Sequence, residues 1–170
     1  MHAEIHLKDE QATVAFGNTL AAALRANFKT PANKCVLITL EGDLGAGKTT
    51  LVRATLRALG VTGAIKSPTY TLLEPYSVPL NSAENKSECL KIAHLDLYRL
   101  QEPEELEYIG GRDLLQIYNL ILVEWPDKAK GYLAKAHIKI QLNHRDKGRQ
   151  LILQSTEFVN DPVLKMFKNS

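Results

Sequence analysis

The strongest constraint on the fold of this chain is the segment from Cys35 to Thr50, which reads CVLITLEGDLGAGKTT. It opens with an apolar and β-branched run, which is typical of a strand buried on both faces of a parallel sheet. Gly42, Gly45 and Gly47 follow, and glycine lets the backbone come close to another group. A buried strand that leads into such a loop predicts a site for an anion, and we expect the anion to be a phosphate.

The loop has the spacing of a phosphate-binding motif. GDLGAGKT, residues 42–49, separates its first glycine from Gly-Lys-Thr by four residues. Backbone N–H groups and the positive end of the following helix would surround the phosphate, and Lys48 would reach the β and γ phosphates. Thr49 would supply a hydroxyl to Mg²⁺. A glycine-rich turn that matches by chance is the alternative, and the strand before the motif and the helix after it argue against that alternative. The predicted nucleotide-binding residues of this loop are Leu44, Gly45, Ala46, Gly47, Lys48, Thr49 and Thr50.

Periodic patterns elsewhere predict alternating helices and strands. Apolar spacings of three and four predict helices at 9–28, with Asp9 as N-cap, and at 49–59, ended by Gly60. Strands are predicted at 91–98 and 120–123, and the residues between them form two short helical pieces broken at Gly110 and Gly111. Alternation from Ile138 onward predicts an antiparallel hairpin, and the polar stretch 75–88 is predicted to be a mobile surface loop.

This order of elements predicts an α/β fold: a three-layer domain like those of P-loop NTPases, with a mainly parallel sheet and an antiparallel C-terminal edge hairpin. With 170 residues, 45% of them hydrophobic, the chain can bury one ordinary core, so we expect a single domain over residues 1–170.

Composition excludes several other classes of protein. The formal net charge is only +2 and no dense basic block occurs, so charge alone does not predict a nucleic-acid binder. No apolar run approaches the ~20 residues of a membrane helix, and the N-terminus does not have the pattern of a signal peptide. Cys35 and Cys89 lack metal-ligand spacing and are expected to be reduced thiols. We therefore expect a cytoplasmic protein with no membrane partner.

Two carboxylates follow predicted strands and are candidates for the metal. Glu124 comes directly after the apolar run LILV, and Asp96 lies within the second predicted strand. Ligands gather at the carboxyl ends of strands in open α/β sheets, although a carboxylate at such a position can also be an ordinary surface residue. We favour Glu124 for Mg²⁺, directly or through water, and Asp96 for the magnesium shell or the attacking water. Which of the two is the direct ligand stays open.

Read in order, the short motifs resemble the TsaE (YjeE) family of small bacterial P-loop ATPases. They run from DEQAT at residue 9 through GDLGAGKTT, SPTYTL, HLDLYRL, PEELE and EW to Gly148 and Arg149, and so cover most of the chain. The chain departs from the usual family pattern in a longer polar loop before His94 and in Gly111, where family members tend to have a larger residue.

The resemblance implies a function in making threonylcarbamoyladenosine in tRNA. The family's ATPase associates with TsaB and the transferase TsaD and contacts tRNA only through that complex. The resemblance also implies that its ATP cycle resets the assembly between turnovers. Carried over by motif, Lys48, Asp96 and Glu124 are the catalytic residues, and Thr49 and Glu124 hold Mg²⁺. Thr13, Asp96 and Arg149 would contact the nucleotide, the segment Ser67–Tyr70 would respond to the γ-phosphate, and Trp125 would lie at or beside the site.

Plainer interpretations accompany the accessory residues. Trp125 and Tyr98 can be core or interface packing, His94 a buried histidine satisfied by hydrogen bonds, and Arg99 the partner of a local acid. Two other functions also remain open. A GTP-dependent switch would need an Asn-Lys-x-Asp segment, which Asn33 and Asn85 do not provide. A small-molecule kinase could use the same loop, but no arginine-bearing lid or acceptor pocket is evident.

Overall fold

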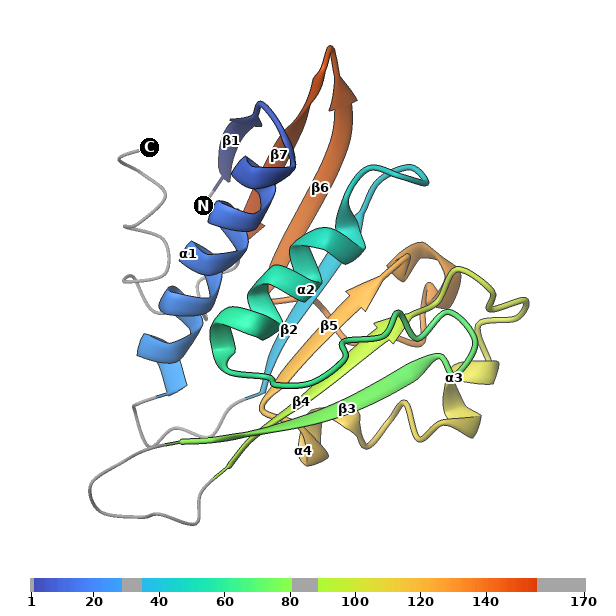
Figure 1. Ribbon diagram of the computed structural model, residues 1–170. Helices are drawn as coiled ribbons and strands as arrows, with labels where there is room; N and C mark the ends of the chain where they lie inside the picture. The colour runs from blue at the N-terminus through green and yellow to red at the C-terminus, as the bar shows by residue number, and fades with distance from the viewer. Residues whose placement is uncertain (1, 29–34, 81–88, 156–170) are drawn as a thin grey trace.

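The computed structural model of the protein describes residues 2–28, 35–80 and 89–155. Within these ranges seven strands form a single sheet in the order β1-β7-β6-β2-β5-β4-β3 (Figure 1). The strands are β1 (His2–Leu7), β2 (Val36–Glu41), β3 (Leu73–Pro79), β4 (Cys89–Asp96), β5 (Leu120–Glu124), β6 (Ile138–Arg145) and β7 (Gly148–Ser155). The helices are α1 (Glu10–Phe28), α2 (Lys48–Leu59), α3 (Glu105–Tyr108) and α4 (Leu114–Ile117), with a 3-10 turn, η1 (Pro126–Ala129).

The centre of the sheet is parallel and its flanks are antiparallel. β2 pairs in parallel with β5 and β6, and β4 pairs in parallel with β5. The remaining pairs, β3 with β4, β6 with β7 and β1 with β7, are antiparallel. The predicted fold class is confirmed. β6 and β7 form the predicted C-terminal hairpin, but the edge strand on that side is β1, which pairs with β7.

Helices cover both faces of the sheet and make three layers (Figure 1). On one face, α1 and α2 pack with Val36, Ile38 and Leu40 of β2 into one apolar cluster. On the other face, Leu37 of β2 joins a second cluster that includes residues of α3 and α4. Because alternate residues of β2 point to opposite faces, both clusters bury it, and all its residues except Glu41 are buried.

The two long helices begin and end where the sequence predicts. Asp9 Oδ1 accepts a hydrogen bond from the N–H of Ala12 at 2.8 Å and so caps the start of α1. Gly60 ends α2 in a left-handed conformation, with φ of 101°. Gly17 sits where α1 crosses α2 so closely that an added Cβ would lie 2.7 Å from Ala54 Cβ.

Two strands were not predicted. β1 lies at the N-terminus and pairs with β7, and β3 occupies Leu73–Pro79, so the prediction of a loop beginning at Pro75 is wrong for residues 75–79. Leu80 follows β3 without regular structure, and residues 81–88 of that predicted loop lie outside the described residues. The break at Gly110 and Gly111 between α3 and α4 is confirmed, and a Cβ on Gly111 would lie 2.7 Å from the Leu106 carbonyl oxygen. Of the helices that the structure describes, none has the length and apolar character to cross a membrane.

Candidate functional site

The glycine loop folds as a tight turn between β2 and α2. Gly42, Gly45 and Gly47 all have positive φ, of 135°, 75° and 102°. At Gly42 the need for glycine is also steric, because an added Cβ would lie 2.1 Å from the carbonyl oxygen of Leu142. No side chain caps the start of α2, so its first-turn N–H groups remain directed at the space beyond the loop.

Lys48 is folded back against the loop that precedes it. Its ammonium nitrogen donates to the carbonyl oxygens of Gly42 at 2.6 Å and Asp43 at 2.8 Å. The same nitrogen lies 3.8 Å from the ring centroid of Trp125, a cation–π distance. Burial lowers the pKa of Lys48, and the carboxylates of Glu124 and Asp96 oppose that effect. The buried cation is therefore held by carbonyl dipoles and an aromatic face.

The two predicted carboxylates meet at the carboxyl edge of the sheet. Asp96 ends β4 and Glu124 ends β5, and they are direct neighbours in the parallel pairing of these strands. Glu124 is also paired with Leu40 of β2, just before the glycine loop. Both carboxylates are nearly inaccessible to solvent, with 4% of Asp96 and 1% of Glu124 exposed.

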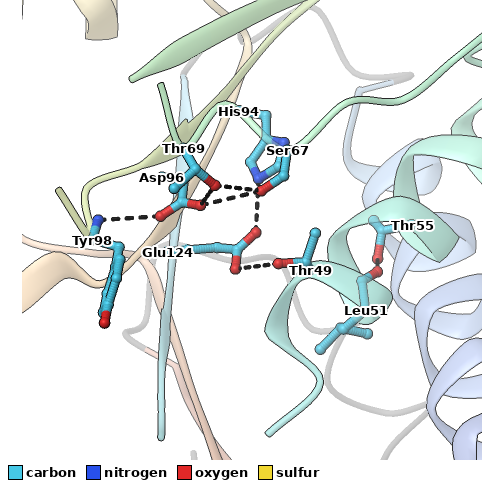
Figure 2. Close-up of polar contacts among 9 residues, drawn as sticks. All are labelled: Thr49, Leu51, Thr55, Ser67, Thr69, His94, Asp96, Tyr98 and Glu124. Atoms are coloured by element: carbon cyan, nitrogen blue, oxygen red, sulfur yellow. Dashed lines mark hydrogen bonds and ion pairs between the residues drawn. The ribbon is translucent and has the colours of Figure 1, made fainter. Parts of the chain in front are cut away.

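Glu124 connects the sheet to the first turn of α2. Its Oε2 accepts a hydrogen bond from Thr49 Oγ1 at 2.8 Å, and its Oε1 lies 2.9 Å from His94 Nε2 (Figure 2). Thr49 and Glu124, the two residues expected to hold Mg²⁺, are therefore in direct contact. His94 is buried and hydrogen-bonded, as its plainer interpretation expects, but its partner Glu124 is a contact that the sequence did not predict. The position of His94 two residues before Asp96 on the same strand was the available signal that both side chains point to one face.

Asp96 holds the segment Ser67–Tyr70. Its Oδ2 accepts from Thr69 Oγ1 at 2.7 Å and from Ser67 Oγ at 3.2 Å, and its Oδ1 accepts from the backbone N–H of Tyr98 at 3.1 Å (Figure 2). Both oxygens of this carboxylate are thus engaged by the protein itself. The exposed Tyr70 stacks on Arg99, whose guanidinium carbon is 4.0 Å from the ring centroid, and this tyrosine rather than a local acid is the contact found for Arg99.

These residues surround a cavity of about 330 Å³. The predicted residues on its wall include Leu44, Gly45, Gly47, Lys48, Thr49, Thr50, Asp96 and Glu124. Trp125 also lines it, with the left-handed φ of 59° that only a minority of non-glycine residues adopt. Its ring lies 4.9 Å from that of Tyr98, so the two aromatic side chains form one wall of the cavity.

A second hollow, of about 220 Å³, lies against the same loop. Gly45, Gly47 and Thr50 line both spaces, whereas Thr13, Ala46 and Arg149 line only the second. Arg149 donates to the carbonyl oxygens of Ala46 and Gly45, each at 3.1 Å. The predicted contact residues Thr13 and Arg149 are therefore brought to the loop but not into the cavity that holds the carboxylates.

The donors around Thr49 and Glu124 fit a hard cation. A hydroxyl and two carboxylates supply only oxygen ligands, which Mg²⁺ prefers. Within the described ranges no group of three or more His, Cys, Asp or Glu side chains could hold a metal by itself. An ion here would take its remaining ligands from phosphate and water, which is typical of Mg²⁺ at nucleotide sites.

Comparisons with known proteins agree with these features. The family model described as "Threonylcarbamoyl adenosine biosynthesis protein TsaE" matches residues 7–151. A relative from Haemophilus influenzae named "tRNA threonylcarbamoyladenosine biosynthesis protein TsaE" is 37% identical over 164 residues, which cover 96% of each chain. A relative of the same name from Nostoc sp. is 33% identical over 85% of this chain and 80% of its own. The crystal structure of Bacillus subtilis YdiB has the same fold, with a TM-score of 0.68 and 22% identity over 99% of this chain and 93% of that one.

Proposed function

The chain belongs to the TsaE family of tRNA threonylcarbamoyladenosine biosynthesis, and from that premise we propose that it is a cytoplasmic, Mg²⁺-dependent P-loop ATPase. It would bind ATP and hydrolyse it slowly to ADP and phosphate. Its target would be the TsaB–TsaD pair, in which TsaD is the transferase, and it would reach tRNA only through that complex. The contact that supports this proposal best is the 2.8 Å hydrogen bond between Thr49 Oγ1 and Glu124 Oε2, directly beside Lys48.

The loop and the start of α2 would bind the phosphates. The first-turn N–H groups of a helix have no intrahelical partners, and the absence of a side-chain cap on α2 keeps them available for an anion. Lys48 would exchange the carbonyls of Gly42 and Asp43 for phosphate oxygens, because a charged acceptor forms the stronger hydrogen bond. These groups would position the chain of phosphates and stabilise its negative charge.

Thr49 and Glu124 would hold Mg²⁺, and Asp96 would contribute to its shell or orient the attacking water. When bound, Mg²⁺ would neutralise charge that develops on the phosphate oxygens. Asp96 accepts hydrogen bonds from Ser67 and Thr69, so a movement of this carboxylate would also move the segment Ser67–Tyr70. This link supports the prediction that the segment responds to the γ-phosphate.

Thr13 and Arg149 would contact the nucleotide from the second hollow. This hollow shares Gly45, Gly47 and Thr50 with the cavity, so a ligand bound to the loop can extend from one space towards the other. In this arrangement the triphosphate would lie on the carboxylate side and the nucleoside on the side of α1 and β7.

Turnover by purified protein tests the proposal. We expect slow release of phosphate from ATP in the presence of Mg²⁺, with a higher rate after addition of TsaB and TsaD. Co-purification with that pair, compared with and without ATP, tests the partner directly. Transfer of the γ-phosphate to a metabolite, with no stimulation by TsaB and TsaD, would instead indicate a small-molecule kinase.

A change of Glu124 to Gln separates binding from hydrolysis. The amide keeps the size of the side chain but removes the charge that would attract Mg²⁺. We expect ADP affinity to stay within about twofold of wild type while Mg²⁺-dependent hydrolysis falls at least tenfold, as judged by calorimetry and phosphate release. Equal turnover in Glu124→Gln and wild type would contradict the proposal that Glu124 binds Mg²⁺.

A further inference from the structure

A buried pair of ionisable side chains lies behind the cavity. His94 of β4 is 0% exposed, and Glu124 of β5 is 1% exposed. Their side chains meet with 2.9 Å between His94 Nε2 and Glu124 Oε1 (Figure 2). Burying two such groups costs free energy unless they are hydrogen-bonded, so this contact offsets the cost of placing both of them inside the protein.

The chemistry of the two groups indicates which of them donates the hydrogen bond and which accepts it. As a ligand of Mg²⁺, Glu124 would be ionised, and an ionised carboxylate only accepts, so His94 would donate to it through Nε2–H. Among the described residues, Nδ1 of His94 has no hydrogen-bond partner, and it is buried. The imidazole therefore has one polar contact, and that contact is with the carboxylate next to Thr49.

We propose that His94 is a positioning residue, which holds Glu124 so that its other oxygen faces Thr49 and the metal. This inference rests on the proposed Mg²⁺-dependent ATP binding and adds a residue to it. A glutamate side chain has several rotatable bonds, and a donor fixed to Oε1 by the neighbouring strand leaves Oε2 in one place, 2.8 Å from Thr49 Oγ1. Groups that orient a metal-binding side chain in this way typically change metal affinity about 10–100-fold when they are removed.

The positioning role predicts more than a packing role would. If His94 only filled space, an apolar residue of similar size would preserve the use of Mg²⁺. If His94 positions Glu124, the same replacement weakens binding of nucleotide with Mg²⁺ and leaves binding of nucleotide without metal unchanged. The ratio of these two affinities therefore distinguishes the roles.

The test compares three variants of the full chain. His94→Leu removes the donor, His94→Asn keeps an amide too short to reach Glu124, and His94→Gln places an N–H close to the position of Nε2. Calorimetry with ATP would be done across a Mg²⁺ series and in EDTA. Mg²⁺ should increase the affinity for ATP, and the Mg²⁺ concentration that gives half of this increase is the quantity to compare. For His94→Leu and His94→Asn we expect that concentration to rise about 10–100-fold, whereas the affinity for ATP in EDTA should be unchanged. His94→Gln should recover most of the wild-type value.

Thr39→Val is the matched control. Thr39 is also buried at this part of the sheet, and its hydroxyl has no partner among the described residues, so this variant alters a buried polar group away from Glu124. We expect it to keep the wild-type Mg²⁺ dependence.

Three outcomes would overturn the inference. The first is wild-type Mg²⁺ dependence in a folded His94→Leu or His94→Asn protein. The second is an equal loss of affinity with Mg²⁺ and in EDTA. The third is a wild-type protein that binds ATP equally well with and without Mg²⁺. That result would contradict the proposed metal site itself, and it would be seen with the wild-type protein before any variant is measured. If His94→Leu does not fold, the Mg²⁺ dependence of His94→Asn compared with that of His94→Gln still distinguishes a positioning role from a packing role.

Discussion

At the scale of single residues, Lys48, the proposed phosphate ligand, is held by contacts within the protein itself. Lys48 is only 4% exposed and is held by two carbonyl oxygens and the Trp125 ring. A phosphate bound as proposed would therefore compete with these contacts. It can do so because a charge-assisted hydrogen bond is stronger than one to a neutral carbonyl.

Replacing Lys48 by Ala tests this competition. We expect ATP affinity to fall about 10–100-fold, since a hydrogen bond to a charged group contributes about 1.5–3 kcal/mol. Isothermal calorimetry measures the change. Lys139→Ala is a suitable control because Lys139 is an exposed residue of β6. Unchanged ATP affinity in Lys48→Ala would contradict the assignment of the phosphate loop.

His137 should make the free energy of unfolding depend on pH. Its Nδ1 accepts a hydrogen bond from the backbone N–H of Leu37 at 2.9 Å, which requires that this nitrogen carry no proton. Burial lowers the pKa of His137 below its ordinary 6.5. Protonation is then easier in the unfolded chain. The contribution of this group is complete above pH 6.5 and is lost as the pH falls from that value towards the lowered pKa.

We therefore expect the free energy of unfolding to decrease between pH 7.5 and 5.5, and part of that decrease should disappear in His137→Asn. Asparagine can place an acceptor oxygen near the position of Nδ1 but does not titrate. Urea denaturation at both pH values measures the effect. An identical pH dependence in the two proteins would show that His137 does not contribute to it.

At the scale of elements, the glycine loop is supported from outside by the C-terminal hairpin. Arg149, in β7, binds the carbonyl oxygens of Gly45 and Ala46, more than a hundred residues earlier in the chain. In a trans peptide the N–H points away from the carbonyl of the same plane. By holding the Ala46 carbonyl, Arg149 therefore also fixes the orientation of the Gly47 N–H, which belongs to the same peptide group.

Replacing Arg149 by Ala should loosen the loop itself. We expect affinities for pyrophosphate and ATP both to fall at least threefold, because both ligands use the loop, and the loss to be larger for ATP, because Arg149 would also contact the nucleotide. Competition binding measures both, with Arg145→Ala, at the exposed turn of the hairpin, as the control. Unchanged affinity for pyrophosphate would show that Arg149 does not support the loop.

The contact of α1 with α2 depends on the absence of a side chain at Gly17. An alanine there gains up to about 1 kcal/mol in helix propensity, but its Cβ would lie 2.7 Å from Ala54 Cβ and 3.1 Å from a backbone nitrogen of α2. Overpacking of this kind typically costs about 1–3 kcal/mol, so we expect Gly17→Ala to lower the free energy of unfolding. Chemical denaturation measures it. Adding Ala54→Gly should restore part of the loss, and no recovery would show that the clash with Ala54 is not the cause.

The elements that could be predicted are those with strong periodicity or distinctive caps. α1, α2, β2 and β5 are long or uniformly apolar, and their ends carry Asp9, Gly60 and the glycine loop. β1 and β3 gave no such signal because both are edge strands that are half exposed, and β3 contains Pro75 and Pro79. Proline is tolerated at an edge, where no further strand needs its N–H, so its presence misled the prediction.

At the scale of the whole molecule, the parallel centre of the sheet is what assembles the site. β2, β4 and β5 point the same way, so the loop, Asp96 and Glu124 arrive at one edge from positions far apart in the sequence. This gathering was predictable from strand order and general rules for α/β sheets. The contacts of His94, Ser67 and Arg149 were not, because they depend on strand register and side-chain direction, which no short motif encodes.

The place of Trp125 gives the protein a built-in optical reporter. It is the only tryptophan of the chain, and its indole faces the ammonium group of Lys48 at 3.8 Å. Emission from an indole changes when a nearby positive charge moves away. Departure of Lys48 towards phosphate would thus alter the fluorescence of the unlabelled protein, and stopped-flow mixing could time each loading and emptying of the loop without any dye.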